Sequence, residues 1–327
     1  MPIRIVVTGG SGFIGTNVIQ FYLEKGIDVT NIDISRPVHP DHSIHWISGN
    51  ICDKTRLIEI FKEISPTFVI HLAARTDLKG KTPDEYSANS QGVINIISAI
   101  NSCGSVRKVL FASSMLVCKA GHIPKNYDEY CPDTAYGKSK VTSELLVKEG
   151  NISCPWNIIR PTSIWGPWFG EPYRKFFDLV IRGRFVHMGG QTATKTFGFV
   201  GNAVYQIDKL LFSQDSAADH RTYYIGDSPP INISDWADEI LSLLGRPPAP
   251  KIPLALFKAA ALSGDILQKL KVPFPMSSFR LKNMTTNNIL NLEDLYAIAG
   301  NPPFNRKTGI ALTLEWLNKF GTPGNNN

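Results

Sequence analysis

Short apolar runs alternate with helical patterns through the first half of the chain. Runs rich in β-branched and aromatic residues predict strands, whereas apolar positions spaced three or four residues apart predict helices. The predicted strands cover residues 3–7, 28–33, 44–47, 68–72, 108–112 and 156–160. The predicted helices cover residues 16–24, 53–64, 85–101 and 134–149. Strands and helices that alternate in this way predict an α/β fold with a doubly wound parallel sheet.

The pattern loses this regularity after Pro161, where Pro, Gly and aromatic residues cluster up to Tyr173. Helices are expected at residues 176–182, 234–244, 254–270 and 311–320, and short strands at 197–200 and 222–225. Ser234 is expected to cap the second of these helices. Residues 247–253 contain several prolines and are expected to form a linker. The second half of the chain therefore predicts a smaller lobe beside the sheet.

A glycine-rich turn joins the first predicted strand to the first predicted helix, and it reads T-G-G-S-G-F-I-G. Gly9 permits a tight turn, Gly12 lets the backbone approach a phosphate, and Gly15 lets the helix and the strand pack closely. Phe13 and Ile14 lie between Gly12 and Gly15, directly before the predicted helix, whose N-terminus offers free N–H groups to an anion. The turn therefore predicts a dinucleotide bound through its pyrophosphate.

The second predicted strand ends in an acidic residue, Asp33, which lies eighteen residues after Gly15. A carboxylate at this position can accept hydrogen bonds from both adenosine ribose hydroxyls, and it would repel a 2′-phosphate. Ser35 and Arg36 follow in the same turn, and the positive charge of Arg36 could offset that repulsion. The expected cofactor is therefore NAD, with NADP as a possible alternative.

These motifs divide the chain into two expected regions. Residues 1–165 are expected to form an NAD(P)-binding Rossmann domain, to which residues 197–225 return. Residues 166–196 and 226–321 are expected to form a substrate-binding lobe over the carboxyl edge of the sheet, where ligands bind in such folds. Residues 322–327 are polar and are expected to be a disordered tail.

Composition narrows the class of protein further. Of the 327 residues, 43% are hydrophobic, which is enough for one large domain or for a domain with a lobe. The net charge is +6, but no contiguous basic block or basic-aromatic interleaving indicates nucleic-acid binding. The five cysteines form no C-x-x-C pair, so we expect a reducing compartment, the cytoplasm, and no metal site. No apolar run reaches membrane length, so no membrane partner is expected.

A phenol and an ammonium group lie four residues apart in the predicted helix 134–149. Tyr136 and Lys140 therefore share one face of that helix. A tyrosine that acts as a base near neutral pH needs a pKa below about 10, and a nearby Lys favours the phenolate. Ser114 directly follows a predicted central strand, and its hydroxyl could hold a substrate oxygen. Together these three residues are catalytic candidates.

With these residues in view, the sequence resembles the extended short-chain dehydrogenase/reductases, specifically the NAD-dependent epimerase/dehydratase group. Asp33 and Asn89, which precedes Gly92, belong to the resemblance. Its other segments extend over nearly the whole chain and are T-G-G-S-G-F-I-G (8–15), H-L-A-A (71–74), F-A-S-S (111–114), Y-G-K-S-K (136–140), R-P-T-S-I-W-G-P (160–167), F-G-F-V-G-N (197–202) and T-G-I-A-L-T-L-E-W-L (308–317).

The resemblance implies a role for individual residues. Ser114 would orient the substrate oxygen, Tyr136 would exchange its proton, and Lys140 would lower the pKa of Tyr136 and bind the nicotinamide ribose. The further contacts that it implies are with the adenine (Asn50, Ile51), with the pyrophosphate and ribose (Leu72, Ala73, Ala74), with the cofactor more generally (Asn89), with the nicotinamide and the substrate (Pro161, Thr162, Ser163) and with a nucleotide diphosphate (Lys195).

Several positions depart from the pattern of the family. Ser163 stands where many nucleotide-sugar enzymes carry Asn, and Lys195 replaces an Arg, which would bind a diphosphate through a two-pronged fork. Asn202 replaces an Asp. Met115 and Leu116 stand where sugar 4,6-dehydratases carry Asp-Glu, the pair that eliminates water, so dehydration is not expected. These departures weaken the expectation of a nucleotide-sugar substrate, but they leave the residues for hydride transfer, Ser114, Tyr136 and Lys140, in place.

The resemblance implies an NAD(P)-dependent enzyme that acts on a secondary alcohol or ketone, and a nucleotide-sugar 4-epimerase in particular. One alternative is a one-way reductase or dehydrogenase of a 4-keto sugar or of a hydroxysteroid-like alcohol. A second alternative is a non-catalytic protein that senses dinucleotides. The partner is expected to be a small molecule. A homodimer is expected through a four-helix bundle formed by the helices at 85–101 and 134–149, with Ile94, Ile97, Ala99 and Val141 on its surface.

Overall fold

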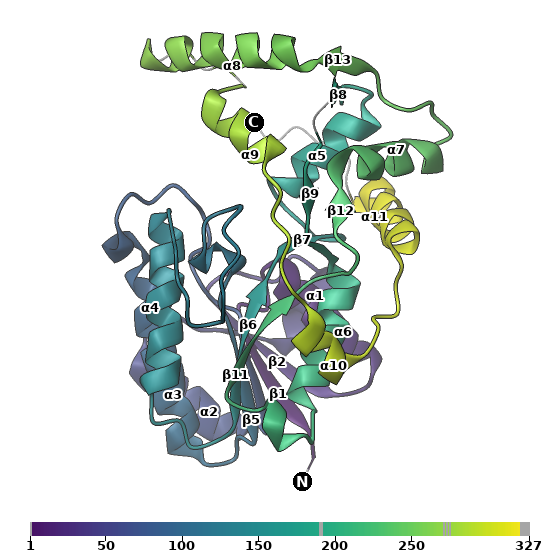
Figure 1. The fold of residues 1–327 in the computed structure, drawn as a ribbon. Helices are drawn as coiled ribbons and strands as arrows, with labels where there is room; N and C mark the ends of the chain where they lie inside the picture. Colours follow the sequence, from purple (N-terminus) through teal and green to yellow (C-terminus); the bar gives the residue numbers. More distant parts are fainter. Residues whose placement is uncertain (1, 190–191, 271, 273, 275, 321–327) are drawn as a thin grey trace.

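A parallel sheet of seven strands lies at the centre of the computed structural model, which describes residues 2–189, 192–270, 272, 274 and 276–320 (Figure 1). Every neighbouring pair in this sheet is parallel. In spatial order the strands are β11 (Arg221–Ile225), β6 (Trp156–Pro161), β5 (Lys108–Ala112), β4 (Phe68–His71), β1 (Arg4–Thr8), β2 (Asp28–Asp33) and β3 (Trp46–Ser48). The order reverses between β1 and β4, and ligands bind at such a switch point.

Helices cover both faces of the sheet, as the fold requires (Figure 1). One face is covered by α2 (Lys54–Ile64), α3 (Ser87–Cys103) and α4 (Ala135–Glu149), and the other by α1 (Phe13–Glu24) and α6 (Val200–Leu211). Successive residues of a strand pack alternately into the apolar cores on the two faces of the sheet. Val6 packs on the α2–α3 side, whereas its neighbours Ile5 and Val7 pack on the α1–α6 side. Burial on both faces explains why these strands are continuous apolar runs.

A second region lies beyond the carboxyl ends of the strands (Figure 1). Its three two-stranded sheets pair β7 (Ser163–Trp165) with β10 (Phe197–Phe199), β9 (Thr194–Lys195) with β12 (Ile231–Asn232), and β8 (His187–Gly189) with β13 (Lys251–Pro253). Its helices are α5 (Tyr173–Ile181), α7 (Ile233–Leu243), α8 (Leu254–Lys269), α9 (Ser278–Thr285) and α11 (Arg306–Phe320), and α10 (Glu293–Ala299) returns beside α6. The aromatic rings of Trp165 and Trp236 lie 5.1 Å apart at its core.

The predicted doubly wound α/β fold is confirmed, but several local predictions differ from the structure. The strand expected at 197–200 ends at Phe199, and α6 was not expected. Ser234 is not the cap of α7, because the Asn232 side chain accepts the hydrogen bonds from the N–H groups of residues 234 and 235. The expected linker 247–253 ends in β13, which pairs with β8. The expected disordered tail, 322–327, lies outside the described residues.

Two further observations concern the fold as a whole. The five cysteines are all free thiols. Within the described residues, no helix has both the length and the apolar character that crossing a membrane would require.

Candidate active site

A cavity of about 810 Å³ opens at the carboxyl ends of the central strands, at the point where the strand order reverses. It collects residues that directly follow β1, β2, β4, β5 and β6. The predicted site residues that line it are Gly9, Gly12, Phe13, Ile14, Gly15, Asp33, Ser35, Asn50, Ile51, Leu72, Ala73, Ala74, Ser114, Tyr136, Lys140, Pro161 and Thr162. Residues widely separated in the sequence therefore share one wall, as parallel topology dictates.

The glycine turn forms a cradle in which Gly9 and Gly15 have no room for a side chain. Gly9 has a φ of +76°, and a Cβ atom there would lie 2.6 Å from the backbone nitrogen of Ala73. A Cβ atom on Gly15 would lie 2.2 Å from the carbonyl oxygen of Gly9. Gly12 precedes the first turn of α1, which contains no acidic residue. A helix N-terminus with free N–H groups beside such a turn fits the pyrophosphate of a dinucleotide.

Asp33 lies at the end of β2, with each carboxylate oxygen bound to the backbone. Its Oδ2 accepts a hydrogen bond from the Ser11 N–H (3.1 Å), and its Oδ1 accepts one from the Ser35 N–H (2.9 Å). These contacts fix the carboxylate in the wall of the cavity while leaving lone pairs that a ribose hydroxyl could use. Arg36 does not line the cavity, because its exposed side chain lies over the ring of Trp46.

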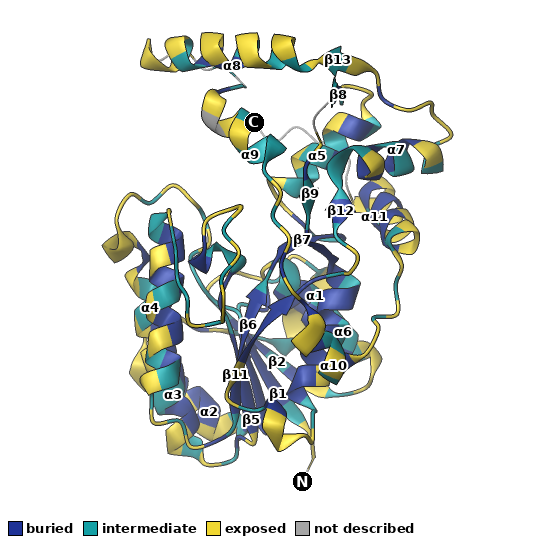
Figure 2. Ribbon diagram, in the orientation of Figure 1, coloured by how far each residue is buried: buried dark blue, intermediate teal, exposed yellow. Residues whose placement is uncertain are grey.

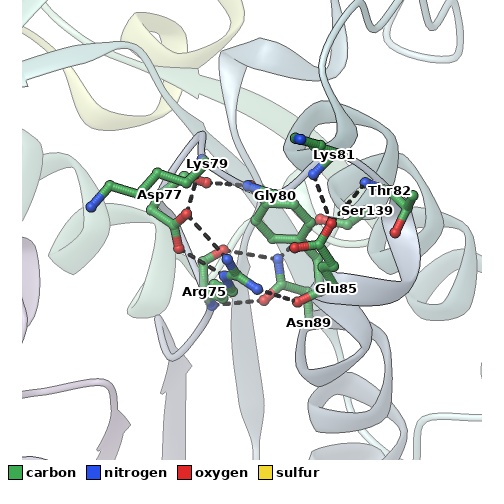
Figure 3. Close-up of polar contacts among 10 residues, drawn as sticks. Arg75, Asp77, Lys79, Gly80, Lys81, Thr82, Glu85, Asn89 and Ser139 are labelled. Carbon is green, nitrogen blue, oxygen red and sulfur yellow. Dashed lines mark hydrogen bonds and ion pairs between the residues drawn. The ribbon is translucent and has the colours of Figure 1, made fainter.

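Asn89 lies behind the cavity wall, where the protein itself satisfies its amide (Figure 3). Its Oδ1 accepts a hydrogen bond from the Arg75 N–H (2.7 Å), and its Nδ2 donates to the Arg75 carbonyl (3.1 Å) and to Ser139 Oγ (3.0 Å). Arg75 lines the cavity and forms an ion pair with Asp77, at 2.7 Å between Nε and Oδ2. Asn89 therefore clamps the strand exit at Arg75 to α4 and makes no contact with the cavity.

The three catalytic candidates meet at one end of the cavity. Ser114 follows β5, and its Oγ accepts a hydrogen bond from the Leu116 N–H (3.1 Å). Tyr136 lies in the first turn of α4, with its hydroxyl hydrogen-bonded to the Ser114 side chain. Lys140 lies one turn further along α4, and its Nζ donates to the Ala112 carbonyl at the end of β5 (2.7 Å). All three side chains are less than one tenth exposed.

The pKa values differ from what the sequence analysis expected. Burial raises the pKa of Tyr136 to about 12, and the hydrogen bond from Ser114 opposes this shift only in part. Burial also lowers the pKa of Lys140 to about 8, while Glu144 acts in the opposite sense. Desolvation disfavours the charged form of both groups, so the pKa of Tyr136 lies above its usual value and not below it, as had been expected.

A buried ion pair positions α4 against the sheet. The Arg160 guanidinium of β6 contacts both carboxylate oxygens of Glu144, at 2.8 Å from Nε to Oε1 and 2.7 Å from Nη2 to Oε2. Neither side chain is more than 1% exposed. The Tyr130 hydroxyl donates to Glu144 Oε2 (2.9 Å), and Arg160 donates to the Tyr224 hydroxyl (3.2 Å). This network fixes α4 one turn beyond Lys140 and thereby fixes the positions of the candidates Tyr136 and Lys140.

Two expected substrate contacts are not among the residues that line the cavity. Ser163 is buried in β7, where it is hydrogen-bonded to the side chain of Tyr173. Lys195 donates from Nζ to the Asn283 carbonyl at the end of α9 (2.8 Å). Neither residue lines the cavity. Tyr173 does line it, although the sequence analysis did not single it out.

Ser113 also lines the cavity and was not singled out as a site residue. Its Oγ is buried and has no hydrogen-bond partner among the described residues. Buried hydroxyl groups are normally paired, so this atom suits a ligand that fills the cavity. Its position after β5, directly before Ser114, could have identified Ser113 as a site residue from the sequence.

The fold and the cavity together define a Rossmann-type protein with a Ser-Tyr-Lys constellation beside its glycine cradle. A family model for the NAD-dependent epimerase/dehydratase family matches residues 5–226. The chain therefore belongs to the NAD-dependent epimerase/dehydratase family of enzymes.

Similar proteins fall into more than one reaction class. A 3β-hydroxysteroid dehydrogenase/Δ5→4-isomerase of Mycobacterium tuberculosis is 29% identical over 264 residues, which cover 74% of this chain and 70% of that protein. The N-acetyl-α-D-glucosaminyl-diphospho-ditrans,octacis-undecaprenol 4-epimerase of Escherichia coli O157:H7 is 26% identical over 320 residues, which cover 96% of this chain and 95% of that protein.

A solved structure with a similar fold is the Thermus thermophilus UDP-glucose 4-epimerase in complex with NAD. Its TM-score is 0.71 at 21% identity, and the match covers 97% of this chain and 100% of that one. At this identity the likeness establishes a common fold. The substrate has to be argued from the site.

Proposed function

We propose that this protein is an NAD-dependent 4-epimerase of a sugar joined to its carrier through a diphosphate. The carrier is a nucleoside, as the sequence analysis expected, or a polyprenol. The observation that carries the proposal is the placing of Ser114 and Tyr136 in the same cavity as the glycine cradle. Ser114 and Tyr136 would hold a substrate hydroxyl beside the reactive end of a dinucleotide, while the glycine cradle would hold the pyrophosphate of that dinucleotide.

Each residue of the site has a role in the proposed reaction. NAD, when bound, supplies a hydride acceptor that can return the hydride. Ser114 orients the C4 hydroxyl of the sugar, and Tyr136 accepts its proton as the C4–H bond breaks. The resulting ketone turns over in the cavity, and Tyr136 returns the proton when hydride is added to the opposite face. Lys140 would hold the nicotinamide ribose, and its positive charge would favour the phenolate against the burial that raises the pKa of Tyr136.

Two features favour epimerisation over dehydration or one-way reduction. Met115 and Leu116 line the cavity next to Ser114, and their apolar side chains supply no acid or base for eliminating water. The match to the undecaprenyl-diphosphate sugar 4-epimerase extends over 96% of this chain, and it therefore includes the region beyond residue 226.

The test is an epimerisation assay in D2O with the purified protein and NAD. UDP-glucose, UDP-N-acetylglucosamine and undecaprenyl-diphosphate N-acetylglucosamine are supplied in parallel, and NMR follows the products. We expect a C4 epimer that retains its original C4 hydrogen, because the hydride returns from the cofactor without exchange with solvent. Steady absorbance at 340 nm is expected as well. Stoichiometric consumption or production of NADH, or loss of water from the sugar, would contradict the proposal.

A one-way hydroxysteroid-type dehydrogenase is the second candidate. It is favoured by the positions of Ser163 and Lys195, which the family resemblance assigns to a nucleotide sugar and which do not line the cavity. The hydroxysteroid dehydrogenase among the relatives supports the same reaction. Incubation with NAD and a 3β-hydroxysterol distinguishes the candidates, because only this dehydrogenase would form one NADH for each sterol oxidised.

We further propose that NAD is preferred over NADP. The carboxylate of Asp33 is fixed by the N–H groups of Ser11 and Ser35, so it cannot move away from a 2′-phosphate without losing both bonds. Calorimetric titration should give a lower Kd for NAD than for NADP, and Asp33→Ala should narrow the difference. Tighter binding of NADP by the wild-type protein would contradict this preference.

We also propose a homodimer through α3 and α4. Its apolar contact surface is smaller than the sequence analysis expected. Ile94 is 41% exposed, but Ala99 is buried inside its own chain and cannot contact a partner. Leu145, which is 40% exposed on α4, adds to the remaining apolar surface. Light scattering should give the mass of a dimer, and Ile94→Glu should reduce it to that of a monomer. A wild-type monomer at micromolar concentration would contradict the dimer.

A further inference from the structure

The helix α8 projects from the end of the molecule that lies farthest from the central sheet (Figure 1). Its sixteen residues make it about 24 Å long, since a helix rises 1.5 Å per residue. Its exposed residues form most of its surface in Figure 2. Only two residues of this helix, Ala261 and Gly264, are buried.

The inner face of α8 is fixed by the segment that leads into α9. A Cβ atom on Gly264 would collide with the backbone carbonyl of Met276, so the two segments are in the closest possible contact. Asp265 Oδ1 accepts a hydrogen bond from the Ser278 N–H (2.9 Å), next to the first turn of α9. In the α8–α9 hairpin, the helix α8 therefore packs with Gly264 and Asp265 turned towards the start of α9.

The outer face of α8 is apolar and has no partner among the described residues. Leu256, Leu262, Ile266 and Leu270 are 60%, 63%, 61% and 68% exposed. At 3.6 residues per turn these four positions fall on one side of the helix, together with the exposed alanines 255 and 259. Of the seventeen large apolar residues exposed in the described part of the chain, five lie between residues 256 and 272. Such a concentrated exposed face marks an interaction surface.

Positive charge is concentrated in the same hairpin. Residues 251–283 contain six Lys or Arg residues and one acidic residue, Asp265, which amounts to five of the six net positive charges of the whole chain. Lys258 and Lys269 are both exposed on α8, and by helical spacing they lie together along one edge of the apolar face. An apolar stripe flanked by lysines is typical of helices that lie in a membrane interface.

We propose that the outer face of α8 docks on the surface of an anionic lipid bilayer. The four large apolar side chains would enter the boundary between headgroups and acyl chains, and Lys258 and Lys269 would contact lipid phosphates. Interfacial docking requires no helix of spanning length. The sequence analysis expected no membrane partner because it considered only spanning runs and contiguous basic blocks.

A short strap connects the docking hairpin to the active site. Residues 286–292 follow α9 and run down towards α10 (Figure 1). In this strap, Asn288 Oδ1 accepts a hydrogen bond from the Gly121 N–H (3.1 Å), and its Nδ2 contacts Met115 Sδ at 3.7 Å. Met115 lines the catalytic cavity. The strap that follows α9 thus contacts a residue that lines the cavity.

An enzyme whose substrate is carried by a lipid needs such a surface. That use of the docking face rests on the proposed function, whereas docking itself does not. The two claims can therefore fail separately, provided that docking is measured without substrate or cofactor turnover.

Docking is tested by co-sedimentation of the full chain with vesicles of mixed phosphatidylcholine and phosphatidylglycerol. We expect the wild-type protein to sediment with these vesicles, and to do so less with phosphatidylcholine alone or at high salt. The double variant Leu262→Ser/Ile266→Ser should bind roughly tenfold more weakly, because it removes apolar insertion. The variant Lys258→Glu/Lys269→Glu should lose the preference for anionic vesicles. Both should retain NAD binding and the near-UV circular dichroism of the wild type.

The matched control is Ile44→Ser/Ile123→Ser, which removes two residues of 87% and 74% exposure far from α8 in the sequence. It should bind vesicles as the wild type does. The proposal is overturned if the wild type stays in the supernatant with anionic vesicles, or if the α8 variant and the control sediment alike. It is also overturned if light scattering shows a dimer that only the Leu262→Ser/Ile266→Ser variant dissociates, because a second copy of the chain would then cover this face.

Discussion

The helices α4 and α8 have almost the same length, with fifteen and sixteen residues, but they place polar and apolar groups in opposite ways. The buried face of α4 is largely polar and contains Tyr136, Ser139, Lys140, Ser143 and Glu144. The exposed face of α8 is largely apolar. Each arrangement reverses the usual preference of a surface helix, which buries its apolar stripe and exposes its charges.

The difference shows that the two helices serve different surroundings. Burying Lys140 and Glu144 costs free energy, which the Arg160 pair and the hydrogen bond to the Ala112 carbonyl offset in part. The result is a fixed geometry for the catalytic candidates Tyr136 and Lys140. The exposed leucines of α8 gain nothing in water, and they become favourable only when another apolar phase covers them. Four substitutions test this contrast between the buried polar face of α4 and the exposed apolar face of α8.

The largest effect is expected at the catalytic face of α4. Tyr136→Phe removes the hydroxyl that is proposed to transfer the proton, while leaving the packed ring in place. It should lower kcat by about 10²–10⁴-fold on a confirmed substrate, with NAD affinity nearly unchanged. Tyr205→Phe is the matched control, since its hydroxyl bonds to the Ala299 carbonyl outside the cavity. Near wild-type turnover by Tyr136→Phe would show that the proposed mechanism is wrong.

The second effect concerns the charge that α4 buries. Glu144→Gln leaves the Arg160 guanidinium buried without a counter-charge, so it should lower the free energy of unfolding by about 3–5 kcal/mol. Urea denaturation measures the change. Glu149→Gln, an exposed position at the end of the same helix, should change the stability by less than about 0.5 kcal/mol. Equal effects of the two substitutions would mean that the buried pair is not a distinctive feature of α4.

The third effect concerns Lys140, whose replacement should stabilise the fold, whereas replacement of Glu144 should destabilise it. The pKa of Lys140 is about 8 in the folded protein against 10.5 for a free lysine, so charged Lys140 costs the folded state up to about 3 kcal/mol below pH 8. This cost falls as the pH rises from 8 towards 10.5. Lys140→Met should therefore stabilise the fold at pH 7 while weakening NAD binding and turnover. Lys138→Met, which changes an exposed residue of α4, should do neither. A destabilised Lys140→Met variant would contradict this account.

The smallest effect is expected on α8. Leu262→Ala should change the free energy of unfolding by less than about 0.5 kcal/mol in the absence of lipid, because the side chain is already in water. The matched control is Leu57→Ala on α2, which removes a fully buried leucine and should cost about 2–5 kcal/mol. Comparable losses at the two positions would show that the outer face of α8 is covered in solution.

The central strands and the glycine cradle were predictable because short-range pattern determines them. A continuous apolar run followed by spaced glycines has few other uses, and Gly9 and Gly15 lie where any side chain would collide with backbone. Helix α6 was missed, although Val200, Val204, Ile207 and Leu211 have helical spacing. The aromatic segment before it had been extended as a strand into its first residue.

Long-range contacts explain why some candidate site residues lie outside the cavity. Asn89 and Lys195 were assigned to ligands by their place in a motif, but each is used within the protein, by the Arg75 backbone and by the Asn283 carbonyl. The pKa of Tyr136 depends on how deeply α4 is buried, which no local spacing reveals. The membrane-facing character of α8 was hidden for a related reason, since an amphipathic sequence gives no indication of which side its neighbours leave open.

The separation of charge in this chain also has a kinetic consequence. With five of six net positive charges in residues 251–283, the rest of the molecule is nearly neutral, and the protein carries an electric dipole along its length. Near an anionic surface the field would turn such a molecule so that the hairpin arrives first. This torque acts within about one Debye length, roughly 8 Å at physiological ionic strength. Orientation would then be selected during approach, so fewer encounters would be lost to collisions with the wrong end.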